Sequence, residues 1–140
     1  MAFRARMVVR FGDIDQAGIV YYPRFLHYYH VALEEFFASE VGVDYPTLVC
    51  EHRLGFPTVH LETDFFRPLR YGERIEVEVA VVAIGRTSIT WRYRTFCSDC
   101  EKIYNQGSNT TVSMDMDTFR KRPTPAWLVE KLRPYRVGPE

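Results

Sequence analysis

The spacing of apolar residues changes once along the chain, from the period of a helix to that of strands. Over residues 23–41 the apolar side chains recur every three or four positions, at Phe25, Tyr29, Ala32, Leu33 and Phe36. This spacing places them on one stripe and predicts an amphipathic helix of about four to five turns. Pro23 suits the first helical position, because proline lacks the N–H group that would have no partner there. Gly42 stands where a C-terminal cap is expected.

The remaining segments are rich in Val, Ile, Thr, Tyr and Phe, which favour strands. Four long strands are predicted after the helix, over 58–66, 74–84, 87–96 and 102–116. Residues 3–11 predict another strand before it, and residues 123–135 a short terminal helix or turn. Consecutive strands with short connections pair mostly antiparallel. The predicted class is therefore α+β, with a curved five-stranded antiparallel sheet wrapped around one long central helix.

Composition and charge narrow the range of functions. The 140 residues suit a single domain, 1–140, that buries about two thirds of the surface of its unfolded chain. Lysine and arginine together number 18, as do aspartate and glutamate, so no broad basic face is expected for binding nucleic acid. No apolar stretch approaches the roughly 18 residues of a membrane span, and the first residues lack the apolar core of a signal peptide. We expect a cytoplasmic protein.

The three cysteines, an odd number, suit a reducing compartment better than a disulfide framework. Cys97 and Cys100 form a C-x-x-C motif, but the intervening Ser98 and Asp99 are turn residues that join two predicted strands. Only Cys50 could supply a third sulfur. A plain hairpin turn is therefore favoured over a zinc or redox site, and no cofactor is expected.

The stretch FGDIDQAGIVYYP, residues 11–23, places two carboxylates and a glycine just before the predicted helix. The first turn of a helix offers unpaired N–H groups and the positive end of the helix dipole. Asp15 could act there as general base or nucleophile, while an N–H near Tyr22 polarises a carbonyl group. Gly18 would let the backbone approach a ligand closely, and it would equally serve a turn. Asp13 is expected to be mainly structural, with its side chain accepting hydrogen bonds from loop amides.

Residues 11–37, FGDIDQAGIVYYPRFLHYYHVALEEFF, resemble the signature of the hotdog-fold acyl-CoA thioesterases of the 4-hydroxybenzoyl-CoA thioesterase type. The segment DFFRPLRYGERIEV, residues 64–77, resembles a later part of the same family. The resemblance implies metal-free hydrolysis of acyl-CoA thioesters, and homodimers that join two sheets and often pair into homotetramers. It also implies that Asp15 is the catalytic aspartate and that the main-chain N–H of Tyr22 polarises the carbonyl.

Arg86 matches one position of a basic loop that contacts nucleotide phosphates in the 4-hydroxybenzoyl branch of this family. It is therefore a candidate for binding the substrate's coenzyme A portion. The neighbouring residues in the turn, Gly85, Thr87 and Ser88, are not basic, unlike those of that branch.

A metal site and two other functions are alternatives to metal-free hydrolysis. His27, His30 and Glu34 fall on one side of the helix but opposite the apolar stripe and without an evident fourth ligand, which favours a polar face over a metal site. The alternative to hydrolysis is a non-catalytic hotdog module that binds acyl-CoA, against which the intact Asp15 and Gly18 count. A dehydratase would require a catalytic histidine in a different motif. Aromatic and short-chain acyl groups both remain open as substrates.

Overall fold

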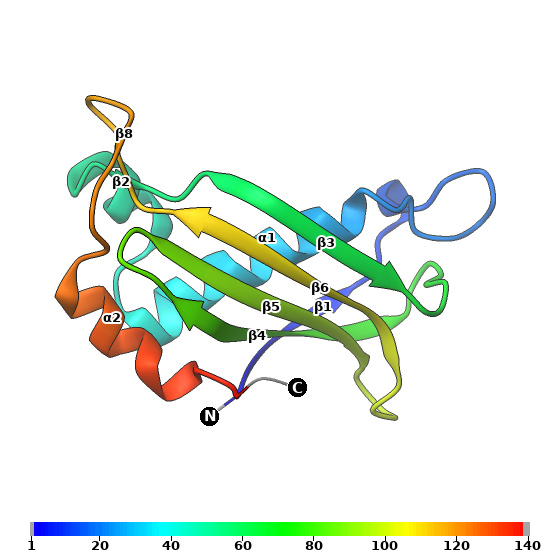
Figure 1. The fold of residues 1–140 in the computed structure, drawn as a ribbon. Coiled ribbons are helices and arrows are strands. Elements are labelled where there is room, and N and C mark those ends of the chain that lie inside the picture. The colour runs from blue at the N-terminus through cyan, green and yellow to red at the C-terminus, as the bar shows by residue number, and fades with distance from the viewer. Residues whose placement is uncertain (1, 139–140) are drawn as a thin grey trace.

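The computed structural model describes residues 2–138, so residues 1, 139 and 140 of the expected domain lie outside the described part. Five long strands form one antiparallel sheet with the order β1-β4-β5-β6-β3, as Figure 1 shows. Their bounds are Phe3–Val8 for β1, Thr58–Phe65 for β3, Arg74–Ile84 for β4, Ser88–Cys97 for β5 and Ile103–Val112 for β6. The predicted five-stranded antiparallel sheet is confirmed.

The long helix α1, Arg24–Phe36, lies against one face of this sheet and continues into a π-helical turn, η2, Phe37–Val41. The helix predicted over 23–41 is therefore confirmed, with Pro23 as its N-cap residue rather than its first helical residue. All five residues of the predicted apolar stripe are at most 4% exposed. Gly42 ends the helix with a φ of 84°, and its N–H donates to the carbonyl of Phe37 over 2.9 Å.

Aromatic side chains fill the space between α1 and the sheet. Tyr29 of α1 stacks on Tyr93 of β5 with ring centroids 4.7 Å apart. Phe36 packs edge-on against Trp91 with centroids 6.0 Å apart. Because side chains alternate across a strand, the opposite face of the sheet carries polar residues, among them Glu78 of β4. The helix therefore covers the apolar face and leaves the other face charged.

Short elements that the apolar pattern did not predict close one end of the sheet. They are the π-helical turn η3, Thr47–Glu51, and a small sheet formed by β2, Leu54–Gly55, β7, Met114–Asp115, and β8, Arg120–Lys121. The single strand predicted over 102–116 is divided in two. β6 ends at Val112, the carbonyl of Ser113 accepts a hydrogen bond from the N–H of Arg122, and the chain continues as β7 in the small sheet. Strands of two residues carry too little alternation to be predicted.

The chain ends with α2, Ala126–Leu132, and the 3-10 turn η4, Arg133–Tyr135, which confirms the predicted terminal helix. Leu128 and Leu132 of α2 are fully buried. Among residues 2–138, no helix combines the length and the apolar character needed to cross a bilayer.

Candidate active site

The loop that precedes α1 is a compact structure of its own. It begins with the 3-10 turn η1, Phe11–Asp13, and Ile14 and Val20 then pair as an isolated antiparallel bridge. The N–H of Asp15 donates to the carbonyl of Ile19 over 3.0 Å. Gly18 closes this small hairpin with a φ of 80°, a left-handed conformation that favours glycine. A Cβ at Gly18 would meet no atom within 4 Å, so the turn requires the glycine for its backbone conformation.

Asp13 ties this loop to the helix. Its Oδ2 accepts hydrogen bonds from the N–H of Arg10 over 2.9 Å and from the hydroxyl of Tyr28 over 2.8 Å. The Nε of Arg24 lies 4.0 Å from Oδ1. Burial, and then the hydrogen bond to Asp13, raises the pKa of Tyr28 above its ordinary value, which keeps the hydroxyl protonated and donating. The predicted bond to a loop amide is present, whereas the bond to Tyr28 was not foreseen.

Asp15 is exposed, and its two carboxylate oxygens are in different situations. Oδ1 accepts a hydrogen bond from the N–H of Ala17 over 2.8 Å, which orients the side chain in the turn. Oδ2 makes no hydrogen bond within residues 2–138, so it is open to a ligand or to water. A carboxylate that is held at one oxygen and open at the other can accept a proton or attack a carbonyl carbon.

The backbone around Tyr22 leaves one N–H group available. The N–H groups on either side already have partners. The N–H of Tyr21 donates to the carbonyl of Asp13 over 2.9 Å, and the N–H of Arg24 donates to the carbonyl of Tyr21 over 2.8 Å. The N–H of Tyr22 donates to no group in the described part of the chain. It precedes the N-cap Pro23, where the dipole of α1 favours negative charge. This N–H can therefore stabilise an oxyanion.

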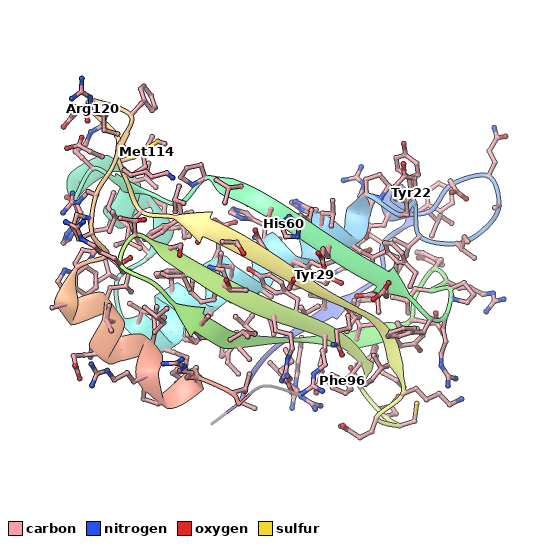
Figure 2. The ribbon with its side chains drawn as sticks, in the orientation of Figure 1. Tyr22, Tyr29, His60, Phe96, Met114 and Arg120 are labelled. Atoms are coloured by element: carbon pink, nitrogen blue, oxygen red, sulfur yellow. The ribbon has the colours of Figure 1, made fainter. Side chains whose placement is uncertain are left out.

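An apolar cavity of about 280 Å³ opens beside Tyr22. One wall is the loop and the start of α1, and the other is the connection between β3 and β4; the lining residues are Ile19, Val20, Tyr22, Phe25, Phe65, Phe66, Arg67, Pro68 and Leu69. The N–H of Val20 donates to the carbonyl of Leu69 over 2.8 Å and joins the two walls. Figure 2 shows Tyr22 at the end of α1 where this loop enters. The cavity is suited to an apolar group whose polar end lies near the N–H of Tyr22.

Arg86 lies far from this cavity. It is exposed in the turn between β4 and β5, at the end of the sheet where β3 begins, whereas Tyr22 lies near Phe65, where β3 ends. The length of β3 separates these two ends by roughly 20 Å. Arg86 and Tyr22 of one subunit therefore lie apart. The contact of Arg86 with coenzyme A stays a prediction.

The exposed polar residues of α1 form the predicted polar face. His27, His30 and Glu34 are all exposed, and Nε2 of His30 lies 3.3 Å from Oε2 of Glu34. Among residues 2–138 no three His, Cys, Asp or Glu side chains gather closely enough to hold a metal ion. His60 on β3 is also exposed, with Nε2 2.8 Å from Oε1 of Glu62.

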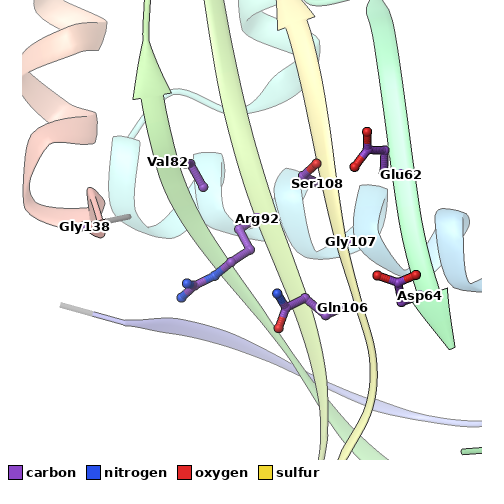
Figure 3. Close-up of a pocket in the computed structure, with 8 residues that line it drawn as sticks. All are labelled: Glu62, Asp64, Val82, Arg92, Gln106, Gly107, Ser108 and Gly138. Atoms are coloured by element: carbon purple, nitrogen blue, oxygen red, sulfur yellow. The ribbon is translucent and has the colours of Figure 1, made fainter. Parts of the chain in front are cut away.

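A second cavity lies on the face of the sheet opposite α1, as Figure 3 shows. Glu62 and Asp64 of β3, and Arg92 of β5, line it together with polar residues of β6. Arg92 is already paired, since its Nη2 lies 3.5 Å from Oε1 of Glu78. The sheet separates this cavity from Asp15 and Tyr22, so the apolar cavity beside α1 is the better candidate for the active site.

The family of the chain follows from comparison with known proteins. A family model described as the thioesterase-like superfamily matches residues 9–132. The chain belongs to this superfamily. A 1,4-dihydroxy-2-naphthoyl-CoA hydrolase of Synechococcus elongatus is 34% identical over 93 residues, which cover 66% of this chain and 68% of that protein. A protein of the same name from Nostoc punctiforme is 26% identical over 140 residues, 100% of this chain and 93% of the relative.

Solved structures of thioesterase-like proteins share the fold. A thioesterase superfamily protein from Jannaschia superposes with a TM-score of 0.90 at 24% identity, over 97% of this chain and 94% of that one. A 1,4-dihydroxy-2-naphthoyl-CoA thioesterase from Synechocystis gives a TM-score of 0.86 at 22% identity, over 95% of this chain and 96% of that one. The predicted hotdog fold and the predicted enzyme class, a thioesterase, are therefore confirmed. The individual roles of Asp15, Gly18, Tyr22 and Arg86 stay predictions.

Proposed function

We propose that this member of the thioesterase-like superfamily hydrolyses an acyl-CoA thioester at the N-terminus of α1, without a metal or cofactor. The observation that carries the proposal is the unpaired N–H of Tyr22 beside an apolar cavity. The open Oδ2 of Asp15 lies on the same loop, just upstream of this N–H in the chain. The names of the relatives, 1,4-dihydroxy-2-naphthoyl-CoA hydrolases, support the class of reaction.

In the proposed reaction the thioester carbonyl oxygen accepts a hydrogen bond from the N–H of Tyr22. As a general base, Asp15 takes a proton from water while the water oxygen bonds to the carbonyl carbon, and the C–S bond then breaks. As a nucleophile, Asp15 bonds to that carbon itself, the C–S bond breaks to release the thiolate of coenzyme A, and water then cleaves the resulting anhydride. In either route the thiolate takes up the proton that the water gives up. In both routes negative charge develops on the carbonyl oxygen, where the Tyr22 N–H and the dipole of α1 stabilise it. Coenzyme A thiol and a carboxylic acid are the products.

The cavity favours an aromatic acyl group over a small aliphatic one. Phe25 and Phe65 lie in its lining with ring centroids 5.5 Å apart and ring planes tilted by 56°, and the ring of Phe66 adds a further aromatic surface. Such rings stack on or pack edge-on against an aromatic ligand. The relatives named for a dihydroxynaphthoyl substrate support the same preference.

The proposed assembly is a homodimer or homotetramer in which two sheets join along β3. Within residues 2–138 this strand pairs only with β6, and it exposes apolar side chains, since Val59 is 59% and Leu61 40% exposed. An unpaired, partly apolar edge is a surface that another strand can cover. Antiparallel pairing of β3 with a second β3 would bring the Arg86 end of one subunit towards the Tyr22 end of the other. Arg86 could then reach the coenzyme A phosphates across the interface.

A panel of thioesters tests this proposal directly. The protein, exhaustively chelated and dialysed, is incubated with 1,4-dihydroxy-2-naphthoyl-CoA, 4-hydroxybenzoyl-CoA, benzoyl-CoA, and short-chain and long-chain acyl-CoA, and thiol release is measured. We expect release from at least one aromatic thioester. Binding of all these compounds without release would favour a non-catalytic acyl-CoA-binding module, and activity restored only by zinc would contradict the metal-free mechanism.

A further inference from the structure

The C-x-x-C motif lies in the hairpin that joins β5 to β6. Cys97 is the last residue of β5, and Cys100 ends the turn that follows. Two hydrogen bonds hold the turn: the N–H of Cys97 donates to the carbonyl of Lys102 over 2.9 Å, and that of Ser98 to the carbonyl of Arg74 over 3.1 Å. The predicted hairpin turn is confirmed. The same turn also carries both cysteines, one at each end.

Cys97 and Cys100 flank Ser98 and Asp99 in this turn, so the two free thiols are neighbours in one hairpin. The side chain of Cys100, followed by the backbone amide of Asp99, lowers the pKa of the Cys97 thiol below its ordinary value, although burial and the charge of Asp99 oppose the shift. The anion is the nucleophilic form of a thiol, so Cys97 is prepared for exchange with a disulfide.

The two thiols differ in their exposure to solvent. Cys97 is half-buried and Cys100 is exposed, and both are free thiols. Cys50 is a third free and exposed cysteine, on the π-helical turn η3. No cysteine pair other than Cys97 and Cys100 is separated by two residues, so Cys50 provides an internal reference for ordinary thiol reactivity.

We propose that Cys97 and Cys100 form a redox-active dithiol that low-molecular-weight disulfides oxidise to an intramolecular disulfide. The Cys97 thiolate attacks one sulfur of the disulfide, a mixed disulfide forms, and one thiolate leaves. Cys100 loses its proton to water and attacks the sulfur of Cys97, and the second thiolate leaves. Both leaving groups take up protons, so two electrons pass from the dithiol to the disulfide, which is reduced to two thiols. This chemistry is separate from the proposed hydrolysis and does not depend on it.

The surroundings of the turn favour an anionic disulfide. Ser98 and Asp99 line a groove of about 410 Å³ together with Arg6, Arg10 and Arg74. Glu76 is the other acidic residue in its lining, so three basic side chains face two acidic ones. A small excess of positive charge raises the local concentration of anions at low ionic strength. Glutathione disulfide and coenzyme A disulfide share this chemistry, and coenzyme A thiol is also a product of the proposed hydrolysis.

The test is a timed oxidation of the full chain, in separate incubations with glutathione disulfide, coenzyme A disulfide and the neutral hydroxyethyl disulfide. Samples are quenched with acid, the remaining thiols are alkylated, and peptides are mapped by mass spectrometry. We expect a Cys97–Cys100 disulfide to form at least about tenfold faster than Cys50 acquires a mixed disulfide. Cys97→Ser and Cys100→Ser should abolish it, and Cys50→Ser should leave its rate unchanged.

The three oxidants show which disulfide reacts fastest and whether the basic groove contributes to the rate. The faster of the two anionic oxidants identifies the preferred one, and both rates should fall as salt is added, whereas the rate with hydroxyethyl disulfide should not. Arg74→Gln should slow only the anionic oxidants, and Arg133→Gln, an exposed arginine of η4, should slow none. Separate mixed disulfides on Cys97 and Cys100 of the wild-type chain, with no bond between them, would overturn the proposed couple. Equal salt dependence for all oxidants would overturn the role assigned to the groove.

Discussion

The hydroxyl of Tyr28 donates a hydrogen bond of 2.8 Å to Oδ2 of Asp13 and so joins the second turn of α1 to the loop in front of it. Asp13 is also the residue whose carbonyl accepts the N–H of Tyr21. These contacts fix the loop on both sides of Asp15 and Tyr22. The geometry of the candidate active site therefore depends on a tyrosine that does not contact the substrate in the proposed mechanism.

Tyr28→Phe should lower stability and turnover together. The change removes one hydrogen bond to a charged group in a part-buried position, so the free energy of unfolding should fall by about 1–3 kcal/mol in urea denaturation. Tyr21→Phe is the matched control, because its hydroxyl makes no hydrogen bond within residues 2–138 and it is 50% exposed. Equal losses in the two variants would show that the bond between Tyr28 and Asp13 does not hold the loop.

Gly18→Ala should destabilise the protein through the backbone alone. A left-handed φ costs an L-residue roughly 1–2 kcal/mol, and the site has space for a methyl group, so no clash contributes. Gly12→Ala is the control, since Gly12 is equally open and has no positive φ. Melting temperature should fall for Gly18→Ala and hardly change for Gly12→Ala. A normal melting temperature for Gly18→Ala would mean that the turn adopts another conformation.

Stability should fall at high pH. Burial, followed by the charge of Glu34, raises the pKa of Tyr45 to about 12, and burial first of all raises that of Tyr104 to about 12. In the unfolded chain these groups lose their protons near pH 10, so between about pH 10 and 12 the folded protein binds more protons. The contribution is fully present below about pH 10 and is lost as pH rises to 12. Denaturant titrations across this window should show a fall in the free energy of unfolding, and Tyr45→Phe should make that fall smaller. An equally steep fall in the variant would show that Tyr45 does not contribute to it.

The parts of the fold that could be predicted depend on neighbours along the chain. The stripe from Phe25 to Phe36 is a local property of one helix, and the long strands carry enough alternation to show their period. The partner of Asp13 could not be predicted, because Tyr28 lies 15 residues away and its distance depends on how the loop folds back. The position of Arg86 could not be predicted either, since only the register of the sheet shows that it lies at the opposite end from Tyr22.

Assembly should be visible in light scattering at micromolar concentration as a dimer or tetramer. Leu61→Glu places a charge on the exposed apolar edge of β3 and should shift the protein towards monomers with reduced turnover. Glu62→Gln, the neighbouring position on the other face of the strand, should leave the assembly intact. A monomeric wild-type chain with full activity would contradict a site completed between subunits.

The central claim, that the carboxylate of Asp15 performs the chemistry, is tested most directly by the turnover of Asp15→Asn per folded oligomer. The amide keeps the size of the side chain and an oxygen for the N–H of Ala17 but removes the charge, so turnover should fall by at least about a hundredfold. Binding of a non-hydrolysable acyl-CoA analogue should persist, since the cavity and the N–H of Tyr22 remain. Asp13→Asn is the control and should lower the melting temperature more than it lowers the turnover of the folded protein. Near-normal turnover in Asp15→Asn would show that this carboxylate is not the catalyst.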